Sequence, residues 1–472
     1  MKRSTYWKRR CGYLCAAMLA FVALCFVACK DDTEQGEEAF DPSKPIVITD
    51  FMPKEGGYGN NLILYGDNFG NDPAKIKVMV GGKQANIVSL KNKVLYCVVP
   101  KAAYDGDVEV AACDASGEEI AYCTAEQKFT YQRQWLVTTI VGQRFEDWND
   151  AKETEGAFDA CGYIKGISWF SFDPKSNFDE MYVTCADQGP VRKINFAEKT
   201  VKFLSHISTS DDRPTLINWT PDENQDMILT RDLKVKGNVN AVYSRASNFE
   251  TKTDLISTLG TIESGNAAMV HPDGQLYYTC YLTQDIYRYD FETKVTTLSS
   301  KHVKTKENLR LVLHPSGKYA YMMRLYYSGN NSGYIARLDY NETTRTFSDP
   351  YIVAGSSGEY GYADGVGNKV RMQGPGQGVF VENPDYAGEE DKYDFYFTDD
   401  YNHCVRVLTP TGRVYTFAGR GNGTTTGGYA DGSLRKEARF NRPWTIAYDE
   451  KRKCFYVGDR ENRVIRKIAL EE

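Results

Sequence analysis

Aromatic residues stand near charged or amide residues at many of the chain's predicted loops and strand ends. The aromatic ones are Trp148, Trp169, Trp219, Tyr281, Tyr326, Tyr360, Tyr401 and Trp444, and the polar ones are Arg324, Asp399, Asn402, Arg442 and Arg460. A flat ring can stack on the C–H face of a sugar while nearby polar groups bind its hydroxyls. These residues predict a carbohydrate-binding site, although Trp169 and Trp444 at strand starts could instead pack between sheets.

Catalytic chemistry has little support in the sequence. The histidines, His206, His271, His302, His314 and His403, are scattered, and their predicted positions do not converge on one metal site. The Gly-rich run at 419–423 precedes no helix, so it does not fit a phosphate-binding loop. Calcium in a central pore stays open, but no loop matches a calcium-binding motif. We therefore expect a binding protein rather than an enzyme, without a cofactor.

Short strands separated by turn residues must position these side chains. The last sixty residues hold runs at 415–419, 445–448, 455–459 and 464–468, bounded by Gly, Asn, Asp or Pro, which favours antiparallel strands. The string GYADG occurs at 361–365 and again at 428–432. Such internal repetition is typical of propellers and solenoids, because one repeat cannot bury its apolar face alone.

These segments resemble NHL repeats, each of which forms one blade of a β-propeller. The resemblance implies six blades within 135–472, with first strands beginning near Ile167, Leu216, Ala268, Leu311, Val379 and Thr445. The sixth blade runs out of chain after its third strand, and WLVTTIVG at 135–142 resembles the missing fourth strand. We expect 135–142 to pair with 464–468 and close the ring, which hides the sheet edges. Blades two and three lie far from the repeat consensus, so five or seven blades stay open.

Long loops between the predicted strands are the expected place for binding, because function concentrates in loops that a rigid scaffold holds. The longest predicted loops are 143–166, 205–215, 325–333, 355–376 and 419–443. Asp187, Asp399 and Asp459 each follow a predicted second strand, which resembles the NHL consensus. Such an aspartate can accept hydrogen bonds from the next loop's backbone, and this structural role is favoured over ligand binding.

A separate module precedes the propeller. Residues 45–131 alternate strand-like runs with turns, which predicts a β-sandwich. LILYGDNFG at 62–70, VVP at 98–100 and FTY at 129–131 resemble an IPT/TIG domain, an immunoglobulin-like fold. The fold class is therefore all-β, an immunoglobulin-like sandwich followed by a six-bladed propeller. The expected role of the sandwich is that of a spacer.

The first residues read as an export signal. Five basic residues precede an apolar run at 11–28, and Cys29 follows, which predicts a signal peptide over 1–28. The end of this run resembles a bacterial lipobox, so Cys29 would carry a lipid, with Cys25 as the alternative. The acidic, polar stretch 29–44 predicts a flexible tether. It also resembles the signal that sends Bacteroidetes lipoproteins to the outer face of the outer membrane.

Charge and cysteine content narrow the partners further. The formal charge of −6 includes that basic leader, so the rest of the chain is more acidic still and a poor candidate for binding nucleic acid. Beyond Cys29 the chain has Cys97, Cys113, Cys123, Cys161, Cys185, Cys280, Cys404 and Cys454. Export would allow disulfides, but spacing cannot choose the pairs.

The leading hypothesis joins these expectations. In Bacteroidetes, proteins of this build resemble accessory binders of glycan uptake systems. We therefore expect a lipid-anchored surface protein that binds a polysaccharide through the long-loop face of its propeller without cleaving it. A propeller that docks a protein partner is the alternative, and a propeller lyase or hydrolase is a weaker one that would need converging carboxylates or metal ligands.

Overall fold

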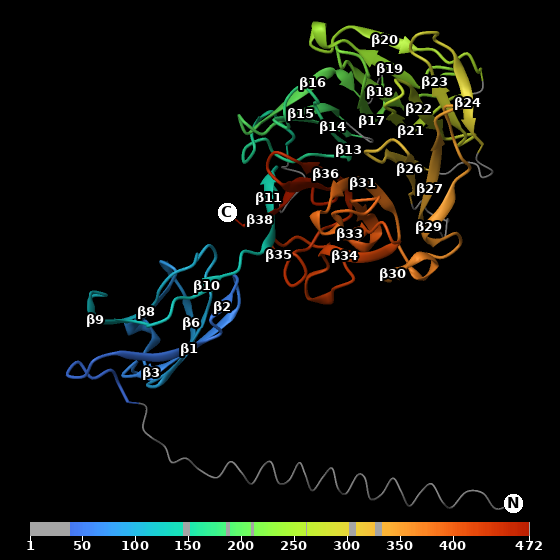
Figure 1. Cartoon of the computed structure of the whole chain (residues 1–472). Helices are drawn as coiled ribbons and strands as arrows, with labels where there is room; N and C mark the ends of the chain where they lie inside the picture. Colours follow the sequence, from blue (N-terminus) through green and yellow to red (C-terminus); the bar gives the residue numbers. More distant parts are fainter. Residues whose placement is uncertain are drawn as a thin grey trace, which may run out of the picture. The chain divides into compact units, whose positions relative to one another are not determined.

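The computed structural model describes residues 38–144, 152–185, 189–208, 212–260, 262–301, 308–325 and 333–471 (Figure 1). The chain divides into two compact units. One comprises Met1–Gln134 together with Glu471–Glu472, and the other comprises Trp135–Leu470.

The N-terminal unit is a sandwich of two antiparallel sheets. One sheet has the order β1 (Val47–Met52), β3 (Asn61–Asp67), β7 (Val94–Val98) and β6 (Asn86–Lys91). The other has the order β5 (Lys83–Gln84), β4 (Ile76–Val80), β8 (Val108–Cys113) and β9 (Glu119–Thr124). A short parallel pair joins β2 (Glu55–Gly56) to β10 (Thr130–Tyr131).

Alternation along the strands explains why the sandwich forms. In β4 the buried residues Ile76, Val78 and Val80 alternate with half-buried ones, so one face of the strand enters the core. Facing residues such as Leu62 and Leu64 in β3 are fully buried in the same cluster. The predicted immunoglobulin-like sandwich is confirmed.

In the described part of the second unit, the strands form six antiparallel sheets, each one blade of a propeller (Figure 1). The first strands are β13 (Ile167–Phe172), β17 (Pro214–Trp219), β21 (Gly265–Val270), β25 (Leu309–Leu313), β31 (Pro375–Glu382) and β36 (Pro443–Asp449). The second strands are β14 (Glu180–Cys185), β18 (Met227–Arg231), β22 (Leu276–Cys280), β26 (Tyr319–Arg324), β32 (Tyr393–Asp399) and β37 (Cys454–Asp459). The expected six-bladed propeller is confirmed, and the alternatives of five or seven blades are excluded.

The outer strands complete each blade. The third strands are β15 (Pro190–Asn195), β19 (Asn240–Tyr243), β23 (Ile286–Tyr289), β27 (Gly333–Asn341), β33 (Cys404–Leu408) and β38 (Val464–Leu470). The fourth strands of blades one to five are β16 (Thr200–Ser208), β20 (Lys252–Leu255), β24 (Thr296–Ser300), β29 (Tyr351–Ser356) and β34 (Arg413–Gly419), and β28 (Thr346–Phe347) also pairs with β27.

The fourth strand of blade six comes from the beginning of the propeller. It is β11 (Trp135–Val141), which pairs antiparallel with β38 from Trp135 opposite Leu470 to Val141 opposite Ile465. The two ends of the propeller sequence therefore meet in one sheet, and the ring has no open edge at that point.

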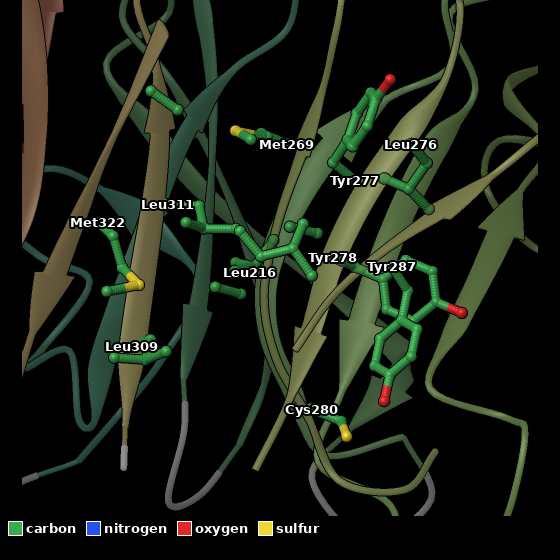
Figure 2. Packing of buried hydrophobic residues seen from close by; sticks show 14 of the residues in the cluster. Leu216, Met269, Leu276, Tyr277, Tyr278, Cys280, Tyr287, Leu309, Leu311 and Met322 are labelled. Carbon is green, nitrogen blue, oxygen red and sulfur yellow. The ribbon is translucent and has the colours of Figure 1, made fainter. Parts of the chain in front are cut away.

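Apolar clusters between neighbouring blades hold the ring together. Figure 2 shows the cluster of blades two to four, in which Leu216, Met269 and Leu311 come from three successive first strands. A second cluster, which includes Val405, Phe455 and Val457, packs blade five against blade six. Because each sheet buries both faces against its neighbours, its strands read as apolar runs rather than strict alternations.

Two further features modify the blades. The GYADG-type loops add short outer strands, β30 (Gly365–Val366) beside β34 and β35 (Gly432–Ser433) beside β11, and β12 (Gly156–Ala157) lies likewise beside β16. In addition, every first strand except β25 has a register irregularity near its beginning. Bulges of this kind re-aim side chains and are common next to binding sites.

Candidate ligand-binding site

The propeller has two distinct ends along its central axis. The first residue of each first strand lies opposite the last residue of the following second strand, as Pro375 lies opposite Asp399 and Pro443 opposite Asp459. Loops between blades and loops from second to third strands therefore share one end, here called the long-loop end. The turns from first to second strands, such as His271–Gly274, lie at the opposite end, here called the turn end.

A cavity of about 360 Å³ occupies the centre of the ring and is lined by the first strands of all six blades. Toward the long-loop end its lining begins at Trp169 and Gln377, and toward the turn end it reaches Leu313, Phe380 and Tyr448. The exposed walls are almost as polar as they are apolar. The cavity thus lies in the turn-end half of the channel, whereas binding was expected at the long-loop face.

Gln377 lines the part of this cavity that is nearest the long-loop end. Its side-chain Oε1 accepts a hydrogen bond of 2.9 Å from the Phe170 backbone N–H, and its Nε2 donates one of 2.8 Å to the Phe170 carbonyl oxygen. The amide thereby connects blade five to blade one, and its side chain is buried. This role could not be predicted from the sequence, because it depends on two segments about two hundred residues apart.

Four of the predicted site residues come together at the long-loop end, where blades five and six meet. The Arg442 guanidinium carbon lies 4.1 Å from the centre of the Tyr401 ring, and that of Arg460 lies 4.6 Å from the centre of the Trp444 ring. Arg442 and Trp444 flank Pro443 at the start of β36. Both aromatic rings are half-buried, so each keeps surface that solvent can reach.

Local geometry fixes these side chains. Arg442 binds Asp400 through both carboxylate oxygens, at 3.0 Å from Nε and 2.8 Å from Nη2. The Trp444 carbonyl accepts a 3.0 Å hydrogen bond from the Thr398 hydroxyl of blade five. A Cβ on Gly376 would lie 2.5 Å from that hydroxyl and from the Trp444 carbonyl, so only glycine permits this approach of the two blades.

Charges are held at unusual pKa values around this site. Burial raises the pKa of Asp400 to about 6, although Arg442 opposes the shift. Burial, with the nearby charges of Arg442, Arg420 and Arg439, lowers the pKa of His403 to about 4. His403 Nδ1 accepts a 3.1 Å hydrogen bond from the Arg442 backbone N–H, which fits a neutral ring.

Asp399 and Asn402 are not available to a ligand, which corrects their assignment as binding residues. Asp399 is fully buried, and its carboxylate accepts hydrogen bonds from Asn402 at 2.8 Å, Arg406 at 3.0 Å and the Gln373 backbone at 2.8 Å. The favoured structural role of Asp399 is what the structure shows. Asp459 has the same environment, with Asn462 and Arg466 at 2.8 Å each.

Trp219 lies at the wrong end of the propeller for the predicted site. It is the last residue of β17, and therefore lies at the turn end. Its ring packs on Tyr182 and Phe249, and its indole N–H donates to the Ser171 hydroxyl at 3.0 Å. Trp219 is therefore not among the residues that the structure brings together at the long-loop end, because β17 runs away from that end and finishes at Trp219.

The remaining predicted residues are dispersed. Trp169 is 7% exposed and belongs to the interblade core, as its alternative role implied. Arg324 ends β26 and is buried, with its guanidinium carbon 5.8 Å from the Tyr334 ring centre. Tyr281 follows β22 and is half-buried, and Tyr360 is exposed in the loop before β30. Trp148, Tyr326, Asp187 and Cys29 lie outside the described residues.

Three other kinds of feature bear on function: metal clusters, disulfides and membrane-spanning helices. Within the described residues, no group of three or more His, Cys, Asp or Glu side chains is arranged to hold a metal ion. The eight cysteines from Cys97 to Cys454 are all free thiols in the structure. No helix among the described residues is long and apolar enough to span a membrane.

Sequence comparison supports both halves of this architecture. The family model of the IPT/TIG domain matches residues 45–131. The NHL repeat-containing protein 2 of Bos taurus is 32% identical over 113 residues, which make up 24% of this chain and 14% of that protein. The match thus spans a small part of this curated relative.

Solved structures match along nearly the whole chain. An auxiliary nutrient binding protein from Bacteroides thetaiotaomicron is 45% identical, with a TM-score of 0.84 over 92% of this chain and 100% of that chain. Another, from Bacteroides ovatus, is 39% identical, with a TM-score of 0.69 over 92% and 100%. A third structure, from Bacteroides thetaiotaomicron and provisionally named a phosphatase, is 30% identical, with a TM-score of 0.77 over 93% and 99%. The chain therefore belongs to the family of these Bacteroides auxiliary nutrient binding proteins.

Proposed function

We propose that the propeller binds a polysaccharide without cleaving it, at the long-loop end where blades five and six meet. One observation carries the proposal: two half-buried aromatic rings, Tyr401 and Trp444, lie at adjoining positions, each with a guanidinium over it. The rings offer stacking surface for sugar C–H faces, and the guanidinium edges offer donors for hydroxyl oxygens. Two adjoining stacking positions suit a chain of sugars better than one small molecule.

Family membership supports an accessory binding role, because two relatives are named auxiliary nutrient binding proteins. The polysaccharide as the nutrient, lipidation at Cys29 and a position on the outer face of the outer membrane are parts of the proposal. In this account the sandwich at 45–131 is a spacer, and the protein serves a glycan uptake system.

Affinity electrophoresis tests the proposal. Residues 29–472 are run through gels that contain one polysaccharide each, beside the variants Trp444→Ala and Tyr401→Ala. We expect at least one polysaccharide to retard the wild-type protein and each variant to bind about tenfold more weakly, as the loss of one stacked ring predicts. Tyr122→Ala is the matched control, since Tyr122 is an exposed aromatic residue of the N-terminal unit. Retardation that both site variants preserve would place the ligand elsewhere, and newly formed reducing ends would indicate an enzyme.

A further inference from the structure

Arg310 is an unusual buried cation. It is the second residue of β25 and is 6% exposed. Its Nη1 donates to two backbone carbonyls, that of Asn266 at 3.2 Å and that of Leu309 at 2.9 Å, both at the beginnings of first strands. Its side chain therefore lies at the long-loop end of the channel. Its buried Nε has no hydrogen-bond partner in the described parts of the chain.

Three other buried arginines show what Arg310 lacks. Arg406 pairs with Asp399 and Asp364, Arg466 with Asp459 and Asp431, and Arg231 with Asp212 and Asp254. Each of these guanidinium groups has carboxylates within the protein. Among the described residues, no ion pair includes Arg310, whose only acceptors are neutral carbonyls.

A second cation lies at the same end of the propeller. Arg460 directly follows Asp459, the last residue of β37, and burial together with the charge of Arg460 lowers the pKa of Arg310 to about 10. The guanidinium of Arg460 lies over the Trp444 ring. Blades four and six thus direct positive charge toward the same mouth of the channel, beside the proposed stacking surface.

Burying a charge without a counter-charge costs free energy, and an anion from solution would offset that cost. A guanidinium binds a carboxylate through two parallel hydrogen bonds, which also fixes the orientation of the bound group. We propose that Arg310, together with Arg460, binds the carboxylate of an acidic sugar, so that the ligand is a polysaccharide containing uronic acid. This inference rests on the proposed function and specifies its ligand class.

The formal charge of the whole chain is −6, so its net charge does not favour the binding of polyanions. Selectivity for an acidic ligand must therefore come from this local pair of cations. Binding should weaken as salt rises, because the attraction between the site and the carboxylate is screened.

The test compares a charged polysaccharide with its neutral form. Polygalacturonate and its fully methyl-esterified form are titrated into residues 29–472 and into the variant Arg310→Gln. Alginate and hyaluronan serve as further acidic probes, dextran sulfate as a sulfated one and neutral galactan and xylan as uncharged ones. We expect at least one uronic acid polymer to bind about tenfold or more tightly than the uncharged polymers, and Arg310→Gln to remove that preference. An increase from 50 to 500 mM NaCl should weaken binding of the acidic polymer only.

The outcomes separate the two proposals. Equal binding of charged and neutral polymers, or a preference that Arg310→Gln keeps, overturns the role of Arg310 while polysaccharide binding stands. Preference for dextran sulfate alone overturns the carboxylate as the ligand group. Binding of none of these polymers contradicts both proposals.

A melting-temperature measurement shows that the variant is folded. Because Arg310 has no carboxylate partner among the described residues, Arg310→Gln should melt no lower than the wild-type protein. The matched variant Arg406→Gln, which strands the buried Asp399, should melt several degrees lower. A large loss of stability in Arg310→Gln would show that an internal partner holds Arg310, and would overturn the proposal.

Discussion

Blades five and six differ from blades one and two in the ion pairs that hold the loops at the long-loop end in place. In blade five, Arg406 joins Asp399 to the Ala363 carbonyl and the Asp364 carboxylate of the first GYADG loop. In blade six, Arg466 makes the same contacts to Asp459, Ala430 and Asp431. The two repeats are equivalent down to individual atoms.

In blade two a buried arginine also pairs with carboxylates, but this arginine occupies the position that the aspartate has in blades five and six. Arg231 lies opposite Pro214, the position that Asp399 and Asp459 hold opposite Pro375 and Pro443. Its carboxylate partners come from elsewhere, Asp212 before the first strand at 3.2 Å and Asp254 in the fourth strand at 2.8 Å.

Blade one keeps the arginine but not the aspartate. Cys185 lies opposite Ile167, in the position of Asp399 and Asp459, and the buried Arg192 contacts both Cys185 and Glu153. Burial lowers the pKa of Arg192 to about 9. Blades one, two, five and six therefore each contain a buried arginine, but the carboxylates that pair with it come from different segments of the chain.

The largest effect should follow from breaking the network of blade six. Arg466→Met leaves Asp459 buried without its cation, which should lower the free energy of unfolding by about 3–5 kcal/mol. Calorimetry of the propeller's unfolding transition would measure this loss. The double variant Asp459→Asn/Arg466→Met should lose less than the sum of the single variants, because the two groups interact directly. A loss below about 1 kcal/mol for Arg466→Met would contradict the claim that this network stabilises the blade.

A smaller and matched effect should appear in the two GYADG loops. Thr416 of β34 and Thr139 of β11 make equivalent bonds, the first to Asp364 and Tyr362 and the second to Asp431 and Tyr429. Thr416→Val and Thr139→Val should each cost about 1–2 kcal/mol, since each removes a hydroxyl that bonds a carboxylate. Thermal unfolding of both variants would show whether β11 fully replaces an ordinary fourth strand, and clearly unequal losses would contradict that equivalence.

Blade one offers a way to sharpen the comparison. Cys185→Asp restores the aspartate that blades five and six have beside their arginine, and Cys185→Asn is the uncharged control of similar size. We expect the aspartate variant to be the more stable of the two by about 1 kcal/mol, because it pairs Arg192. Equal melting temperatures would mean that Glu153 already satisfies Arg192 completely.

The smallest effect concerns pH. The pKa of His403 in the folded protein is about 4, below its ordinary value of 6.5. As pH falls from 6.5 toward 4, the unfolded chain takes up a proton at this site that the folded protein does not, so stability falls. His403→Asn, which tolerates the positive φ of 55° there, should flatten the slope of melting temperature against pH in that window. An unchanged slope in His403→Asn would contradict this assignment.

Much of the fold could be predicted from the sequence, because strand length and turn residues are local properties. First strands were expected at Ile167, Leu216 and Thr445, and they begin at Ile167, Pro214 and Pro443. The aspartate series was predicted less well. Asp187 was grouped with Asp399 and Asp459 by spacing, whereas the strand register puts Cys185 in that position. Blade one therefore has a cysteine at the position where blades five and six have an aspartate.

The candidate site was only partly predictable for a physical reason. Tyr401, Arg442, Trp444 and Arg460 were each predicted as candidates, but only the structure shows that Arg442 lies over Tyr401 and Arg460 over Trp444. Gln377 of blade five bonds Phe170 of blade one, and Arg310 bonds Asn266 of the neighbouring blade three. Such contacts between distant segments cannot be read directly from a single sequence. A charged residue in the apolar run around Leu311 was the one available hint.

The main claim to be tested is that ligand binds at the long-loop end, between blades five and six, and not in the cavity at the turn end. Hydrogen exchange of residues 29–472, with and without a retained polysaccharide, tests this claim most directly. We predict slower exchange in peptides that cover 399–403 and 441–446, with the segment 271–275 unchanged. Protection confined to 271–275 and the end of β25, with 399–403 and 441–446 unaffected, would contradict the claim and place the ligand in the turn-end cavity.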